Sequence, residues 1–542
     1  MKKQILAIFM TLILIITVGC SAAAPAADAP TASAEEPSYA TPAEEPSYNY
    51  GPAAPAQPAP PMDGGYYDEE YYPRSGENYL QIDENPLKQV ESQPLSTFSL
   101  KVDTAAYTNV VRYIESRSLP PVDAVRIEEM INYFNYEAEM PFGQHPFSIY
   151  TELGPSPFDS SKHMAFIRVK ARDIDKQNLP NSNLTFLIDT SGSMNSFDKL
   201  PLLKEAFSLL VDTLGEDDVV SIVTYAGNAG VVIDSVSGED KQTILRAIDN
   251  LSPGGSTAGA KGIQTAYALA EKNYRPGGNN RVILATDGDF NVGTSNTNEL
   301  SRMISNKRGS GIYLSVLGFG TGNIRDDIME TLAKDGNGNY AYINSVATAK
   351  KVLVDELTSN LFTIADDVKA QVEFNPATVQ DYRLIGYENR QLNNRDFEDD
   401  SKDAGEIGVG TDVVFMYELT LRGSTQSSGL KYGDNHAQDV QIAHADELFE
   451  VRIRYKQPGQ QVSQLMTQPV VFGDIARINS DDYNFACSVA AFGHLLRNSP
   501  YAGRVTMEDV SSLASQSLGR DEGGYRVAYL DTIRQYRQFA GY

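Results

Sequence analysis

The sequence predicts an α/β protein whose central domain is built on a doubly wound, mostly parallel sheet. Between about residues 180 and 345, apolar runs of strand length alternate with amphipathic helical patterns. Such alternation is typical of a parallel sheet that is covered by helices on both faces. Runs that alternate polar and apolar residues lie on both sides of this stretch. We therefore expect the α/β domain to be inserted between flanking β-sandwich and helical segments.

Each element of the central domain follows from its local pattern. Continuous apolar runs predict four strands, at 186–188, 219–225, 281–286 and 312–319. Apolar residues at helical spacing predict the helices between them, at 199–214, 263–270 and 298–308. A further run at 231–236 follows 219–225 after a short glycine-containing link. Because so short a link cannot cross over a sheet, we expect one antiparallel edge strand.

The flanking segments carry patterns that predict a β-sandwich. Residues 147–153 and 163–171 alternate polar and apolar side chains before the central domain. Three runs after it do the same, at 368–374, 412–421 and 448–455. Strands on both sides of an insertable unit indicate a single sandwich, formed by flanks that meet.

Helical patterns lie outside these strands at both ends of the folded part. Residues 96–136 hold two of them, separated by Leu119-Pro-Pro121. The chain is helical again from Asp482, and Thr506-Met-Glu-Asp509 matches a capping box before a final helical pair. Cys487 lies in the first C-terminal helix, where we expect it to be a small buried hydrophobe.

The strand at 186–188 ends in Asp189-Thr-Ser191-Gly-Ser193, which places one acid and two hydroxyls on a tight loop. Open α/β sheets bind ligands at the carboxyl ends of their strands. Small side chains with hard oxygen atoms suit a hard divalent cation better than a metal that prefers thiolates. The motif alone is a weak signal, because serine-rich turns and helix caps look similar.

Two later segments strengthen this interpretation. Ser252-Pro-Gly-Gly-Ser-Thr257 precedes a helical pattern, and the run at 281–286 stops at Asp287-Gly288. In order and approximate spacing the set resembles the metal-ion-dependent adhesion site of the von Willebrand factor type A (VWA) domain. The resemblance implies metal contacts by three hydroxyls, and by two carboxylates directly or through water: Ser191, Ser193, Thr257, Asp189 and Asp287. The alternative is that each Asp is an ordinary turn residue.

The expected ion is Mg²⁺, or Mn²⁺, and its charge defines what the site could bind. Magnesium takes near-octahedral oxygen coordination and dehydrates reluctantly, so hydroxyls and water would fill much of its shell. Neutral hydroxyls compensate the ion's charge less than a cage of carboxylates would. A carboxylate offered by a partner is then a favourable additional ligand, and the site suits binding better than metal storage.

Segments outside the central domain carry a second resemblance, to YfbK-type bacterial VWA lipoproteins. It runs from about residue 95 to the C-terminus and rests on Val102–Val110, Leu119–Phe134, Gly336–Tyr342, Asn360–Pro376 and Arg383–Arg390. It implies that nearly the whole folded part is a single family unit with a VWA domain inside it.

The N-terminus predicts export and a lipid anchor. A basic start is followed by an apolar run from Ile5 to Val18, which is typical of a signal peptide and shorter than a transmembrane anchor. Val18-Gly19-Cys20 resembles a lipobox, which implies lipidation of Cys20. Residues 21–90 are rich in Pro, Ala, Glu and Tyr and predict an extended, disordered tether. We expect a membrane-anchored envelope lipoprotein, at the outer membrane if the host is Gram-negative.

Composition excludes several classes of function. The formal net charge of −26 argues against nucleic-acid partners. With two cysteines, one of them in the lipobox, we expect no internal disulfide. The sequence has no HExxH, G-x-S-x-G or P-loop motif, so we do not expect an enzyme.

These observations divide the chain into five regions: a signal peptide (1–20), the tether (21–90), an N-terminal region of helices then strands (91–179), the VWA domain (180–345) and a C-terminal β-strand plus helical region (346–542). The predicted function is metal-dependent adhesion to a protein or polymer that offers a carboxylate. The alternative is an envelope assembly or scaffold factor that uses the VWA domain for complex formation.

Overall fold

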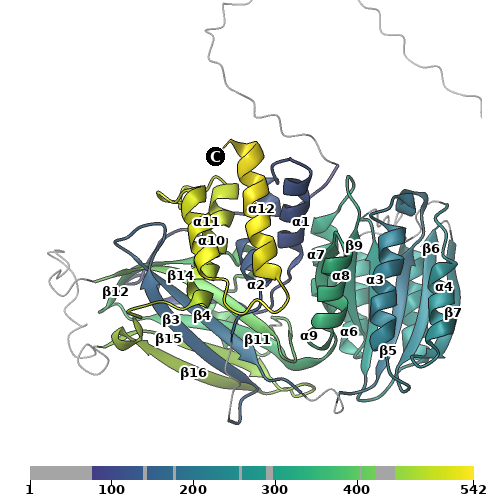
Figure 1. Cartoon of the computed structure of the whole chain (residues 1–542). Helices are drawn as coiled ribbons and strands as arrows, with labels where there is room; N and C mark the ends of the chain where they lie inside the picture. Colours follow the sequence, from purple (N-terminus) through teal and green to yellow (C-terminus); the bar gives the residue numbers. More distant parts are fainter. Residues whose placement is uncertain are drawn as a thin grey trace, which may run out of the picture. The chain divides into compact units, whose positions relative to one another are not determined.

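The computed structural model describes residues 76–137, 143–174, 179–226, 228–255, 259–288, 297–402, 404–422 and 446–541. Within these ranges the chain forms three sheets and two groups of helices (Figure 1). The predicted signal peptide, Cys20, most of the tether and Thr257 lie outside the described residues. In the part that is described, no helix combines the length and the apolar character needed to cross a bilayer.

The central sheet has six strands in the order β10-β9-β8-β5-β6-β7. All neighbouring pairs are parallel except β6 with β7, which confirms the predicted antiparallel edge strand. The bounds are β5 Ser182–Asp189, β6 Val219–Ala226, β7 Asn228–Ser237, β8 Asn279–Thr286, β9 Tyr313–Phe319 and β10 Asn337–Ile343.

Helices cover both faces of this sheet, as expected for a doubly wound fold. One face packs against α3 (Leu200–Thr213), α4 (Lys241–Asp249) and α8 (Val346–Lys350). The other packs against α5 (Gly259–Lys272), α6 (Thr297–Gly309) and α7 (Asp326–Asp335). Every residue of β5 and β8 is buried, which explains the apolar runs that these strands contain, at 186–188 and 282–285.

The other two sheets form the predicted sandwich, and residues from both share one hydrophobic core. One sheet has the order β1-β12-β14-β4-β3, and the other runs β13-β11-β15-β16, with β2 also paired to β11. Strand β4 lies antiparallel to β14, so segments from before and after the VWA domain are neighbours in one sheet. The bounds are β1 Lys88–Gln89, β2 Leu95–Ser99, β3 Phe147–Pro155, β4 His163–Ala171, β11 Thr363–Phe374, β12 Val379–Ile385, β13 Ile407–Gly408, β14 Asp412–Leu421, β15 Glu447–Lys456 and β16 Ser463–Val471.

A helical layer packs on the outer face of the β4–β14 sheet, with Phe166 and Met416 in its core. Its helices are α1 Ala105–Glu115, α2 Ile127–Asn132, α10 Asp481–Leu496, α11 Met507–Gln516 and α12 Tyr525–Ala540 (Figure 1). The capping box at Thr506 and Asp509 is present, and Cys487 is buried. Between the VWA domain and β11 the chain forms a π-helical turn (Lys351–Asp355) and α9 (Leu357–Leu361).

Two features correct the sequence analysis. Residues 95–99 form β2 and not part of a helix, because β11 supplies their backbone partners from more than 250 positions along the chain. Residues 76–90, which we assigned to the tether, contact the folded part: Glu77 pairs with Arg112, and the side chain of Asn85 donates to two backbone carbonyls. The pairing of β1 with β12 and the burial of Val90 in the sandwich core also hold this segment, so the tether ends before residue 76.

Candidate functional site

The loops that follow β5 and β8 place the predicted acidic ligands at one edge of the sheet. The two strands are parallel neighbours, with Ile188 opposite Ala285. Asp189 ends β5 and Asp287 immediately follows β8, so both carboxylates lie at the carboxyl ends of adjacent strands. Both side chains are fully buried. This is the position at which open α/β sheets bind ligands.

The two serines lie on the loop that continues from Asp189. The backbone N–H of Ser191 donates to Oδ1 of Asp189 at 2.8 Å, and the hydroxyls of Ser191 and Ser193 are 2.9 Å apart. Ser191 is buried, whereas Ser193 is exposed. The buried side chain of Met194 fixes the loop to the core. The loop therefore forms a short line of oxygens that leads from a buried carboxylate to the surface.

The segment that leads to Thr257 lies against this loop. The N–H of Gly192 donates to the carbonyl of Gly255 at 3.2 Å, and the N–H of Gly254 donates to the carbonyl of Thr190 at 2.8 Å. The structure thus brings together the Asp189 loop and the start of the Thr257 loop. Because Thr257 itself lies outside the described residues, its role stays a prediction.

Burial raises the pKa of the Asp189 carboxyl to about 6, and repulsion from Asp287 acts in the same direction. Hydrogen bonds from Ser191 and Tyr225 lower this pKa and only partly offset the burial. The hydroxyl of Thr286 also lies 3.4 Å from Oδ2 of Asp189. Two buried carboxylates that repel each other favour a cation between them.

Lys199 is a charged neighbour that the sequence analysis did not assign to the site. Its Nζ lies 2.8 Å from Oδ2 of Asp287 and 3.2 Å from Oδ1 of Asn323. In the sequence, Lys199 is only the first residue of a helical pattern. A signal was present, because Lys199 occupies the N-cap of α3, and a cation is unfavourable at a helix N-terminus.

The loop that carries Asn323 is held by the start of the described chain. Glu77 accepts a hydrogen bond from the N–H of Gly322 at 2.9 Å and pairs with Arg112 at 2.8 Å. The N–H of Asn78 donates to the carbonyl of Ile324 at 3.0 Å. The segment after the tether therefore fixes the loop between β9 and α7, which contacts the site through Asn323.

The donor set fits a hard cation. Across the described ranges, no three His, Cys, Asp or Glu side chains group in a way that could hold a metal ion. Any metal at the sheet edge would therefore depend on hydroxyl oxygens as well as on Asp189 and Asp287. Hydroxyls and carboxylates are ligands for Mg²⁺ and Mn²⁺, and a set without thiolate or imidazole disfavours softer metals.

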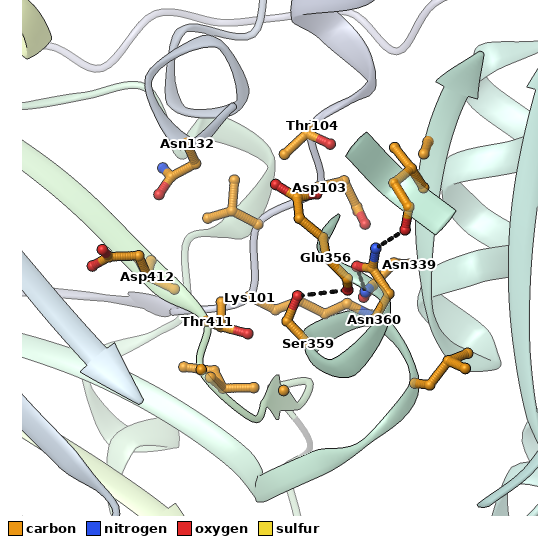
Figure 2. A pocket seen from close by; sticks show the side chains of 18 of the residues that line it. Lys101, Asp103, Thr104, Asn132, Asn339, Glu356, Ser359, Asn360, Thr411 and Asp412 are labelled. Atoms are coloured by element: carbon orange, nitrogen blue, oxygen red, sulfur yellow. Dashed lines mark hydrogen bonds between the residues drawn. The ribbon is translucent and has the colours of Figure 1, made fainter. Parts of the chain in front are cut away.

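A second candidate is a cavity of about 200 Å³ at the junction of the VWA domain with the sandwich and the first helices. Figure 2 shows side chains from all three regions around it, among them Asp103, Asn339 and Thr411. Charged side chains that line it pair with other groups of the same chain: Asp103 with Arg390, Asp412 with Arg168, Glu356 with Lys351, and Lys101 with the carbonyl of Gly338. These pairings stabilise the junction, so the sheet edge is the stronger candidate.

Comparison with protein-family models agrees with the fold. The model for the von Willebrand factor type A domain matches residues 183–356, and one described as von Willebrand factor matches residues 73–165. The model described as "Uncharacterized protein YfbK, C-terminal" matches residues 359–539. The three matches together span most of the described chain.

Individual proteins are also similar to this chain. YfbK of Escherichia coli (strain K12) is 43% identical over 466 residues, which cover 84% of this chain and 80% of that protein. Protein sll0103 of Synechocystis is 29% identical over 184 residues, 34% of this chain and 42% of its own length. A solved structure described as von Willebrand factor type A from Catenulispora acidiphila is 16% identical with a TM-score of 0.41, covering 74% of this chain and 91% of its own.

Proposed function

The chain belongs to the family of the Escherichia coli protein YfbK, and on this premise we propose that it binds a protein or polymer partner through a divalent cation held at the edge of its VWA sheet. The VWA domain supports a role in protein interaction or adhesion and not in catalysis. The observation that carries the metal-dependent form of this role is the line of oxygens from buried Asp189 to exposed Ser193.

Asp189, Ser191, Ser193, Thr257 and Asp287 would hold Mg²⁺ or Mn²⁺ at this edge. The bound ion would supply positive charge for an anionic ligand. Such a ligand could reach the ion, because Ser193 faces solvent. It would also be attracted to the ion, because neutral hydroxyls leave part of the positive charge uncompensated. A carboxylate of the partner would then complete the coordination shell.

An aromatic side chain next to the site supports a protein partner. Phe197 follows Ser193 on the same loop and is 86% exposed. Aromatic side chains are enriched among the residues that contribute most to protein–protein affinity. Phe197 would pack against an apolar side chain of the partner while the partner's carboxylate reaches the metal.

We also propose that the protein is anchored in the cell envelope by a lipid on Cys20, at the outer membrane in a Gram-negative host. The apolar run before Cys20 and the Pro-rich segment after it support this. Protease treatment of intact cells tests the exposure of the domain. Cleavage of the VWA domain supports adhesion at the cell surface, whereas protection favours the scaffold role inside the envelope.

Calorimetric titration of Mg²⁺ and of Mn²⁺ into the chain from residue 21 tests the metal-dependent function. We expect saturable binding in the wild type and none in a variant that carries Asp189→Ala together with Thr257→Ala. Equal binding by both proteins would place the metal elsewhere. The absence of binding in both, also with added acetate as a surrogate carboxylate, would contradict the proposal.

A further inference from the structure

We infer that the Lys199 ammonium competes with the divalent cation for Asp287 and leaves the loaded site with a net positive charge that an anionic partner neutralises. This inference rests on the proposed function and adds to it the residue that sets both metal affinity and the preference for an acidic ligand. It is carried by the position and burial of Lys199 and by the charges that surround it.

Lys199 makes a direct ion pair with one of the two carboxylates of the site. Its Nζ lies 2.8 Å from Oδ2 of Asp287, and the exposed fractions of the two side chains are 9% and 0%. Asn323 accepts a second hydrogen bond from the ammonium at 3.2 Å. Because the pair is shielded from water, salt screens it only weakly. An ion that binds Asp287 must therefore share this carboxylate with Lys199.

The surrounding structure holds Lys199 in this place. Its backbone N–H donates to the carbonyl of Ser196 at 3.1 Å, and its carbonyl accepts from the N–H of Leu203 at 2.8 Å. The aliphatic part of the side chain lies over Gly320, where a Cβ would collide with it; the φ of Gly320 is +76°. Local preference does not explain a lysine at a helix N-terminus, because the helix dipole repels it. Asp287 supplies the compensating charge.

The charges of these side chains determine the character of the site. Asp189 and Asp287 each carry −1 when ionised and Lys199 carries +1, so the three together carry −1. A divalent cation changes the total to +1, and one carboxylate from a partner neutralises it. Without Lys199, the empty site carries −2 and the loaded site carries no net charge. Removal of the ammonium should therefore strengthen metal binding and weaken the binding of an anion to the loaded site.

A purely structural role for Lys199 predicts a different result. If Lys199 only held the loop between β9 and α7, its removal would lower stability and leave metal affinity unchanged or weaker. Lys199→Gln removes the charge but keeps a hydrogen-bond donor, and Lys199→Arg keeps the charge. Lys204→Gln is a matched control, because Lys204 lies on the same helix and donates to the carbonyl of Asp249, which is not part of the site.

The test is calorimetric titration of Mn²⁺ into the chain from residue 21, for the wild type and the three variants, with far-UV circular dichroism to verify folding. A charge this close changes ionic equilibria of a neighbouring group by roughly tenfold or more. We therefore expect Lys199→Gln to bind Mn²⁺ about tenfold more tightly, with Lys199→Arg and Lys204→Gln near the wild-type value. Folded Lys199→Gln with unchanged or weaker Mn²⁺ binding would overturn the inference.

Acetate then probes the charge of the loaded site. We expect acetate to bind the Mn²⁺-loaded wild type more tightly than Mn²⁺-loaded Lys199→Gln, and equal binding would overturn this half of the inference.

The proposed function fails separately, if the wild type binds no Mn²⁺ or if Asp189→Ala binds it equally well. Should only Lys199→Gln bind Mn²⁺, competition by Lys199 would stand and a metal-dependent function of the natural chain would fall.

Discussion

Two clusters of buried carboxylates in this protein are compensated in different ways. The interface cluster, which joins the first helices to α7 and to the segment after β12, consists of Asp103, Arg126, Glu129, Asp326, Glu330 and Arg390. Arg126 binds both oxygens of Asp326 and both oxygens of Glu129. At the sheet edge, by contrast, the Lys199 ammonium pairs with Asp287, and the partners of Asp189 include the neutral hydroxyl of Thr286 and the backbone N–H of Ser191.

This difference shows what each cluster is suited for. A guanidinium is planar and offers several donors in fixed directions, so it locks the carboxylates around it. An ammonium is a compact point charge, and hydroxyls reorient easily. The interface cluster therefore holds the VWA domain against its neighbours, whereas the sheet edge is better suited to the exchangeable cation that we propose. Removal of the Arg126 guanidinium from the interface cluster should therefore lower stability, whereas removal of the Asp189 charge from the sheet edge should raise it.

The largest effect is expected from Arg126→Met. Asp326 and Glu129 would stay buried without their partner, and loss of one member of a buried ion pair typically costs about 3–5 kcal/mol. Urea unfolding measures the change. Arg325→Met is the matched control: Arg325 is 40% exposed and pairs with Asp327 at 3.2 Å, so its loss should cost less than about 1 kcal/mol. Equal losses in the two variants would remove the contrast between the clusters.

Asp189→Asn should act in the opposite direction. The pKa of this carboxyl is raised to about 6. The stability that its protonated form contributes is therefore fully present below the ordinary pKa near 4 and is lost as pH rises through 6. At pH 7.5 and without metal, the neutral amide should stabilise the protein by roughly 1–3 kcal/mol. Urea unfolding in the presence of chelator gives this value. A loss of stability above about 1 kcal/mol would mean that the carboxylate has a structural role.

The smallest effect concerns the pH dependence of the interface cluster. Burial raises the pKa of Glu129 to about 8, against the opposing charge of Arg126. Folding therefore makes the ionised form of Glu129 less favourable than it is in the unfolded chain. The stability that this shift contributes is fully present below the ordinary pKa near 4.5 and is lost as pH rises through 8. Between pH 6 and 8 the wild type should lose about 1–2 kcal/mol more than Glu129→Gln. Parallel stability curves for the two proteins would contradict this assignment.

Much of the fold could be predicted from the sequence because its signals are local. Strands β5 and β8 of the VWA sheet are buried along their whole length, so they contain apolar runs, and Asp189 and Asp287 interrupt these runs where the strands end. The alternation in β4 and β14 likewise indicated a sandwich, although the sequence could not show their pairing, since more than 240 positions separate Ile167 from Phe415.

The residues that the sequence did not reveal act through distant partners. Lys199 reads as the first residue of an amphipathic helix, and only the fold brings its ammonium to Asp287, 88 positions away. Arg126 and Asp326 are 200 positions apart. Residues 77 and 78 resemble the tether in composition. Their sequence gives no sign of the loop that they contact, because that loop lies near residue 322. Local patterns define elements, whereas charge compensation is decided by tertiary contacts.

We propose that the sheet edge, and not another part of the molecule, holds a divalent cation. An anomalous difference map from crystals of the chain grown with Mn²⁺, measured above the manganese absorption edge, locates the ion directly. We expect one strong peak next to the hydroxyls of Ser191 and Ser193, close to Asp189 and Thr257. A peak elsewhere, or no peak while Lys199 still pairs with Asp287, would contradict it.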